Sequence, residues 1–315
     1  MRTAVRTLLE GLIDYAGLFP PAKKSMTDAV AEFARRRMGE DTAFLGVFVC
    51  PASRLEELTS CGRSSMPGTY ATSGYREMAL DTTPWEVSVV VDTPLNEALD
   101  AIDAFNERHA TEDQGLAKAR TVEMRVADAG AIDDAVDELP EDIRPFFELP
   151  RDVLDTDPRG MIAALATAEG LAAKVRCGGV EPDMIPSSAA VANFIDACAR
   201  AGVPFKATAG LHHPIRAEQA LTYDADSPRA VMHGFVNVFV ASALAYDRKA
   251  DAETLTKVLE ETDAGAFTLD DTGASWRDLR VDGDAFGSAR SRFALSFGSC
   301  SFAEPVDDLR TLGWL

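Results

Sequence analysis

The chain has 315 residues, 46% of them hydrophobic, and its 31 basic and 51 acidic side chains give a formal net charge of −20. This apolar fraction supports a sizeable core and excludes wholesale disorder. The acidic excess argues against a protein that binds nucleic acid or anionic membranes, because both attract basic surfaces. Such a charge favours solubility, and a salt-rich cytoplasm, as in a halophile, is one setting that would use it.

Strand-like apolar runs recur along the chain, and each is followed by the apolar spacing of an amphipathic helix. In chain order the sequence predicts strands at 12–15, 44–50, 87–92, 122–126, 145–149, 172–177 and 204–208. Residues 267–270 and 294–298 both qualify as an eighth strand, and the Asp271-Thr272-Gly273 turn after the first is typical of a hairpin. The last barrel strand is therefore expected at 294–298.

This alternation is typical of a parallel sheet, and eight strand–helix units close into a barrel. We therefore predict an α/β fold: a single (β/α)8 TIM barrel over residues 1–315, with an insertion of helices and a hairpin at about 221–292. Thr93-Pro94 and Pro186-Ser187 mark helix starts, and Gly202 is expected to cap a helix end. The polar loop at 61–77 is either a lid or a connection.

No apolar run of signal-peptide length occurs in residues 1–10, and the most apolar stretch, 235–245, is too short to span a bilayer. The five cysteines form no CxxC pair, so neither a disulfide framework nor a zinc site is indicated. We expect a reduced, cytoplasmic protein that acts on a small molecule. The sequence does not determine the oligomeric state, and a homo-oligomer is among the states that it allows.

Four neighbouring predicted strands carry charged side chains: Glu123 and Arg125, then Glu148, then Lys174 and Arg176, and finally Lys206, with Thr208 on the same face. Because helices cover the outside of such a barrel, these charges are expected to point into its lumen. Burying unpaired ions costs several kcal/mol, so they must pair with one another. A buried ion network without chemistry is the alternative interpretation.

The two lysines are the most informative of these residues, since only seven of the 31 basic side chains are lysine. An amine becomes a nucleophile when desolvation or a nearby cation lowers its pKa. Lys206 and Arg176 would supply that cation for Lys174, and Glu123 can move protons as a carbinolamine forms and collapses. This arrangement is typical of Schiff-base chemistry on a carbonyl.

Six short motifs resemble those of the class I aldolases, specifically the deoxyribose-phosphate aldolase family, in the same order and over nearly the whole chain. LIDYAGLFP at 12–20 is similar to that family's L-I-D-x-x-x-L-x-P, VFVCP at 47–51 to V-C-V-x-P, and GSCS at 298–301 to G-A-S-S. VEMR at 122–125 stands where the family has its catalytic aspartate. KVRCG at 174–178 and KATAG at 206–210 stand where it has its Schiff-base lysine and second lysine.

The resemblance implies a TIM barrel and a carbon–carbon lyase that needs no cofactor, with Lys174 forming the imine and Lys206 lowering its pKa. The departures from the family favour another substrate than deoxyribose phosphate. Glu123 replaces the aspartate, Arg125 and Arg176 follow two residues after Glu123 and Lys174, and the end of the sixth strand lacks hydroxyls. We expect a small anionic carbonyl compound, phosphorylated or carboxylated.

Several other residues are candidates for holding that substrate: Arg125, Arg176, Thr208, Asp14, Glu148, His213 and the two serines of the last motif, Ser299 and Ser301. The serines precede a helix whose free N–H groups form an anion site, although such a turn also simply caps a helix. His212 follows the Lys206 strand directly, and acid/base catalysis is the interpretation we favour for it.

Two further functions compete with the aldolase. The first is a metal-assisted hydrolase or isomerase, in which a divalent metal is bound by His212, His213, Glu148 and an aspartate (Asp14 or Asp92), with His233 as a further ligand. No H-x-H or H-E-x-x-H spacing supports it. The second is a barrel that binds a metabolite without catalysis. His233 and Asn237 are four residues apart in a predicted helix, where a buried core pair is favoured.

Overall fold

The computed structural model describes residues 1–68 and 83–315, so residues 69–77 of the polar loop considered above lie outside the described part. Eight parallel strands close into a barrel in the order β1-β13-β7-β6-β5-β4-β3-β2. They are β1 (Ile13–Tyr15), β2 (Leu45–Pro51), β3 (Trp85–Val90), β4 (Ala117–Arg125), β5 (Arg144–Glu148), β6 (Ala172–Arg176), β7 (Phe205–Thr208) and β13 (Ala294–Ser299). The predicted TIM barrel and the choice of 294–298 as its last strand are confirmed.

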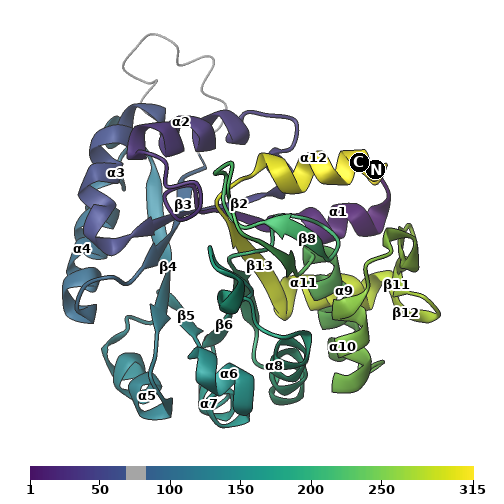
Figure 1. Ribbon diagram of the computed structural model, residues 1–315. Helices are drawn as coiled ribbons and strands as arrows, with labels where there is room; N and C mark the ends of the chain where they lie inside the picture. Colours follow the sequence, from purple (N-terminus) through teal and green to yellow (C-terminus); the bar gives the residue numbers. More distant parts are fainter. Residues whose placement is uncertain (69–82) are drawn as a thin grey trace.

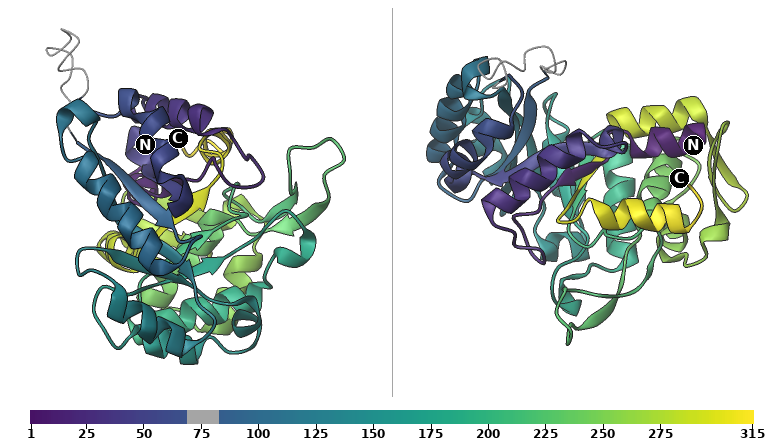
Figure 2. Two further views of the ribbon diagram at one scale, coloured as in Figure 1. Left: turned by 90° about the vertical axis from the view of Figure 1, so that its left-hand side faces the viewer. Right: turned by 90° about the horizontal axis from the view of Figure 1, so that it is seen from above.

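Helices surround this barrel, and Figure 1 shows α4, α5, α7 and α8 along the outside of β4, β5 and β6. The helices of the first half are α1 (Thr3–Leu9), α2 (Met26–Arg37), α3 (Leu55–Gly62), α4 (Leu95–Arg108), α5 (Ala129–Glu138) and α6 (Arg151–Thr156). The others are α7 (Arg159–Leu165), α8 (Ser188–Ala201), α9 (Phe235–Tyr246), α10 (Ala252–Glu260), α11 (Gly283–Arg292) and α12 (Ala303–Thr311). Figure 2 shows the two termini near each other.

The predicted helix boundaries are correct where a side chain or a glycine does the capping. Ser187 caps α8 by accepting a hydrogen bond from the Ala190 N–H, and Gly202 ends α8 in the left-handed conformation at φ 71°. Thr93 does not cap α4. Pro94 holds the cap position without a side-chain bond, and the Thr93 hydroxyl lies against the Pro94 carbonyl instead.

The stretch between β7 and β13 contains more sheet than the predicted hairpin. β10 (Phe267–Asp270), β11 (Gly273–Trp276) and β12 (Leu279–Asp282) form a three-stranded antiparallel sheet. All four residues of the central strand are buried, because this small sheet packs against α1, α9 and α11. A second hairpin, β8 (Ala217–Ala220) with β9 (Arg229–Met232), has no counterpart in the prediction.

Helix α9 is apolar on every side and all its residues from 235 to 245 are buried. It contacts α8, α10, α11 and β13, so it is a core helix rather than an amphipathic one. No helix within 1–68 and 83–315 is long and apolar enough to cross a bilayer.

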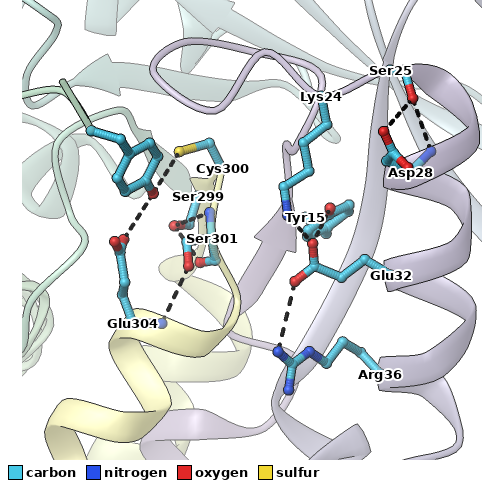
Figure 3. A network of polar contacts seen from close by, with 11 residues as sticks. Tyr15, Lys24, Ser25, Asp28, Glu32, Arg36, Ser299, Cys300, Ser301 and Glu304 are labelled. Atoms are coloured by element: carbon cyan, nitrogen blue, oxygen red, sulfur yellow. Dashed lines mark hydrogen bonds and ion pairs between the residues drawn. The ribbon is translucent and has the colours of Figure 1, made fainter.

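Alternation along β1 places neighbouring side chains on opposite sides of the barrel wall. Asp14 points inward, whereas Tyr15 points out and its hydroxyl donates to Glu32 of α2 at 2.8 Å. Glu32 also forms ion pairs with Lys24 and with Arg36, whose Nη2 lies 3.7 Å from Glu32 Oε1 (Figure 3). This outer cluster holds α2 and the loop before it against β1, which fixes the strand that presents Asp14.

Candidate active site in the barrel lumen

Five buried charged side chains form one chain of ion pairs across the lumen. Lys206 Nζ lies 2.6 Å from Asp14 Oδ2 and 2.6 Å from Glu123 Oε1. The other oxygen of Glu123, Oε2, lies 2.9 Å from Lys174 Nζ, which in turn lies 2.7 Å from Glu148 Oε2. We call Asp14, Glu123, Glu148, Lys174 and Lys206 the lumen network.

The barrel register explains why residues far apart in sequence meet here. Lys174 and Lys206 are direct neighbours across β6 and β7, and Glu148 is the neighbour of Lys174 across β5 and β6. Glu123 reaches both lysines from β4. Because side chains alternate between the two faces of a strand, the period of two seen in the sequence correctly directs these charges to one interior. The predicted pairing of the buried charges is thus observed.

Hydroxyl and backbone groups that the sequence analysis missed complete the network. The Ser88 hydroxyl donates to Glu123 at 2.7 Å, and that of Ser296 donates to Asp14 at 2.7 Å. The Val47 N–H donates to the second oxygen of Asp14 at 3.1 Å. All eight barrel strands therefore contribute a polar group. A single hydroxyl within an otherwise apolar strand, as in Val87-Ser88-Val89, is the signal that could have identified the two serines.

The neighbouring opposite charges favour the ionised forms of Glu123, Glu148 and Lys206. Burial disfavours the charged form of Glu123, but Lys174 and Lys206 outweigh it and hold the pKa of this carboxyl far below its ordinary value. Burial likewise opposes the charge on Lys206, and Asp14 and Glu123 still raise the pKa of its amine. Lys174 and Arg176 lower the pKa of Glu148 against the effect of its burial. Glu123 and Glu148 are thus ionised hydrogen-bond acceptors at neutral pH.

Two arginines connect the lumen network to solvent at the carboxyl ends of the strands. Arg176 Nε donates to Glu148 Oε1 at 3.1 Å, and Arg125 Nε lies 3.4 Å from the same oxygen. Their side chains are 39% and 80% exposed, whereas that of Glu148 is 8% exposed. The structure therefore brings the predicted arginines to the edge of the site, with guanidinium surface left to bind an anion. Thr208 is the neighbour of Arg176 across β6 and β7.

The predicted histidines and serines at this end of the barrel make contacts outside the lumen network. His212 Nδ1 lies 2.7 Å from Glu304 of α12, and His213 Nδ1 lies 2.6 Å from Asp308. The Ser299 hydroxyl donates to the Ser301 carbonyl at 2.7 Å, and the Ser301 hydroxyl accepts from the Glu304 N–H. The serine hydroxyls are thus engaged in the turn that begins α12, which matches the capping alternative.

The residues considered for a metal shell are dispersed among different partners. Asp14 and Glu148 belong to the lumen network, and Asp92 accepts from the Ser53 hydroxyl and N–H. His233 Nε2 lies 2.9 Å from the Pro186 carbonyl oxygen, and burial lowers its pKa to about 4. In the part of the chain that the structure describes, no three His, Cys, Asp or Glu side chains are arranged to hold a metal ion.

His233 and Asn237 are both buried and hydrogen-bonded, as the core interpretation predicted. Asn237 donates to the carbonyls of Val258 and Glu261 and accepts from the Arg216 N–H, so it ties α9 to α10 and to the preceding loop.

In comparisons with known proteins, no family model, no curated protein and no solved structure matches the chain. The fold and the lumen network are therefore what a functional assignment must rest on.

Proposed function

We propose that the protein is a class I aldolase-like lyase that forms a Schiff base between Lys174 and a small anionic carbonyl compound. The observation that carries this proposal is a pair of buried lysines at neighbouring register positions that share one carboxylate, Glu123. A buried ion network that only stabilises the fold does not need two amines side by side, whereas imine chemistry uses both.

Lys174 is the better candidate for the nucleophile. Its side chain is 6% exposed and pairs with Glu148, the carboxylate that Arg125 and Arg176 reach from solvent. Lys206 is 2% exposed, is held by two carboxylates at 2.6 Å, and has its Nζ 5.3 Å from the centre of the Phe146 ring. A substrate that enters from the arginine edge therefore meets Lys174 first.

In the proposed reaction, Lys174 Nζ first gives up a proton and attacks the carbonyl carbon. The carbonyl oxygen leaves as water, and the resulting iminium accepts the electron pair when the bond between the α- and β-carbons of the substrate breaks. The β-hydroxyl group loses its proton and becomes the carbonyl of the released fragment, and the enamine left on Lys174 is protonated at the α-carbon and hydrolysed. Glu123 Oε2, at 2.9 Å from Nζ, is placed to relay the protons of carbinolamine formation and collapse. Lys206 neutralises the other oxygen of Glu123, so it weakens the hold of this carboxylate on the Lys174 ammonium group.

The anionic group of the substrate is assigned to Arg125 and Arg176. Their guanidinium groups converge on Glu148 Oε1, and both remain partly exposed. A carboxylate or phosphate can bind such a pair of guanidinium groups through several charge-assisted hydrogen bonds, which would place the carbonyl beside Lys174.

Borohydride trapping tests the proposal, because reduction converts an imine into a stable amine adduct. The protein is incubated separately with acetaldehyde, pyruvate and dihydroxyacetone phosphate, reduced, and analysed by intact and peptide mass spectrometry. We expect one adduct, on Lys174, with an anionic probe preferred over acetaldehyde.

The Lys174→Arg variant keeps the buried positive charge and cannot form the imine, so it should fold and lose the adduct. Lys257→Met is the matched control, since Lys257 is an exposed lysine paired with Glu253 on α10. Lys206→Met should slow trapping by about tenfold near neutral pH, because it removes the cation that neutralises the other oxygen of Glu123. Trapping that persists in Lys174→Arg contradicts the assignment of the nucleophile, and no adduct with any probe contradicts the imine.

A further inference from the structure

A second cluster of reactive groups lies where β13 meets α12, apart from the lumen network. Cys300 directly follows β13, and its Sγ lies 3.8 Å from His212 Nε2. The other ring nitrogen of His212, Nδ1, lies 2.7 Å from Oε2 of Glu304, the second residue of α12. Figure 3 shows Cys300 and Glu304 at this junction. A thiol, an imidazole and a carboxylate are thus connected in series.

This order of groups is the one that activates a nucleophile. The carboxylate accepts the Nδ1–H and fixes the ring, which leaves Nε2 facing the sulfur, where a proton can pass between the two groups. Burial opposes a charge on His212, but Cys300 and Glu304 together raise the pKa of the imidazole to about 9. At neutral pH the ring is therefore an imidazolium ion whose Nε2–H faces the sulfur.

Other titratable groups face the cluster from three sides. Tyr223, between β8 and β9, has its hydroxyl 3.7 Å from Cys300 Sγ and 3.2 Å from Glu304 Oε2. Burial and the hydrogen bond to Glu32 raise the pKa of Tyr15 of β1, and the nearby Cys300 adds to this shift. The pair of His213 and Asp308 lies one turn further along α12. Burial and the neighbouring Cys300 and Glu304 raise the pKa of Tyr223, so its hydroxyl stays a hydrogen-bond donor.

We propose that Cys300, His212 and Glu304 form a nucleophilic thiol centre that adds to α,β-unsaturated carbonyl compounds. The thiolate sulfur forms a bond to the β-carbon, and the electron pair of the C=C bond moves to give an enolate. The His212 imidazolium ion supplies the proton that converts the enolate into the saturated carbonyl product. The net step adds S–H across the double bond, so it needs no oxidant, reductant or leaving group.

Three features of the centre fit this class of electrophile. Sulfur is a soft, polarisable nucleophile that suits a conjugated carbon. The proton that the product needs is already on His212. The Tyr223 hydroxyl, next to the sulfur, can donate to the carbonyl oxygen as charge develops on it.

Tyr223 is an exposed side chain in contact with the buried sulfur. Cys300 is 4% exposed, whereas Tyr223 is 58% exposed and lies over it on the loop of the β8–β9 hairpin. A small electrophile therefore reaches the thiol when this side chain moves, and removal of the ring should speed the reaction. This centre uses none of the lysines, so its test is independent of the proposed imine chemistry.

Acrylamide, itself a small α,β-unsaturated carbonyl compound, is the probe for the experiment. The full chain is treated for short times at pH 6 and pH 8, and the adducts on Cys300 and Cys61 are quantified by peptide mass spectrometry. Cys61, half-buried on α3 against the Thr27 hydroxyl, is the internal control. At pH 6 we expect Cys300 to react at least about tenfold faster than Cys61, because the thiolate is the reactive form.

Variants then assign the effect to the centre. His212→Gln should slow the reaction of Cys300 at pH 6 by about tenfold or more and leave Cys61 unchanged. Asp308→Asn, which removes the carboxylate of the neighbouring His213 pair, is the matched control and should leave both rates unchanged. Tyr223→Ala should raise the rate at Cys300.

A Cys300 that reacts equally fast in folded His212→Gln overturns the proposal. So does a Cys300 that stays no more reactive than Cys61 in folded Tyr223→Ala, where the covering ring is gone. Circular dichroism establishes that each variant is folded.

Discussion

Replacement of Glu123 by glutamine is the sharpest test of the lumen network as a unit. Glutamine keeps the size of the side chain but removes the negative charge that faces Lys206 at 2.6 Å and Lys174 at 2.9 Å. Its NH2 group must also point at one of the two ammonium groups or at the Ser88 hydroxyl, all of which are hydrogen-bond donors. The substitution therefore leaves two buried cations short of a partner.

The size of the effect follows from burial and from the partners that remain. Removing one member of a buried ion pair costs about 3–5 kcal/mol, because the charge left behind is not solvated. Lys174 and Lys206 are at most 6% exposed, but Glu148 and Asp14 still pair with one each. We therefore expect Glu123→Gln to lower the free energy of unfolding by about 3 kcal/mol, near the lower end of that range.

Urea unfolding at pH 7 and one fixed salt concentration measures this loss. The matched control is Glu86→Gln on β3, since Glu86 is 40% exposed and pairs with Arg120 at 3.4 Å. An exposed pair of this kind contributes less than about 1 kcal/mol. A loss in Glu123→Gln no larger than that in Glu86→Gln refutes the reasoning.

The stability difference between the wild type and Glu123→Gln should also depend on pH. The pKa of Glu123 is depressed in the folded state, so its stabilising effect is present above the unfolded value of about 4.3. That effect disappears as the pH falls through the lower folded value. The difference in unfolding free energy between the wild type and Glu123→Gln should therefore shrink in acid.

Two further predictions concern His212 and Asn237. The pKa of His212 is raised to about 9 from an ordinary value of about 6.5, so its stabilisation is complete below pH 6.5 and is lost as the pH rises through about 9. The stability of the wild type relative to His212→Gln should fall by about 3 kcal/mol over that interval, and a flat difference contradicts the ion pair with Glu304. Asn237→Ala leaves the Glu261 carbonyl and the Arg216 N–H without their side-chain partner and removes one of two donors to the Val258 carbonyl, so it should cost about 2–4 kcal/mol in urea unfolding. Exposed Asn96→Ala should change stability by less than about 0.5 kcal/mol, and an equal loss in both variants argues against the buried hydrogen bonds.

Much of the lumen network can be predicted from the sequence, because strand periodicity is a local property. A period of two assigns Glu123, Lys174 and Lys206 to one face without knowledge of the partner strands, and the cost of burying charge implies that they pair. The number of strand–helix units and the right-handed connection between parallel strands then lead to a closed barrel. The fold and the inward direction of these charges were therefore determined by the sequence alone.

Contacts made by loops and single hydroxyls depend on tertiary structure. Ser88 and Ser296 support the carboxylates only because the barrel register brings them beside Glu123 and Asp14. Cys300 meets His212 across 88 positions of the chain. The alternation of side chains along a strand does not predict where a loop residue lies. The position of such a residue depends on how the β8–β9 hairpin and α12 pack over the strand ends. Local alternation thus decided which residues enter the lumen, and long-range packing decided which residues meet at its mouth.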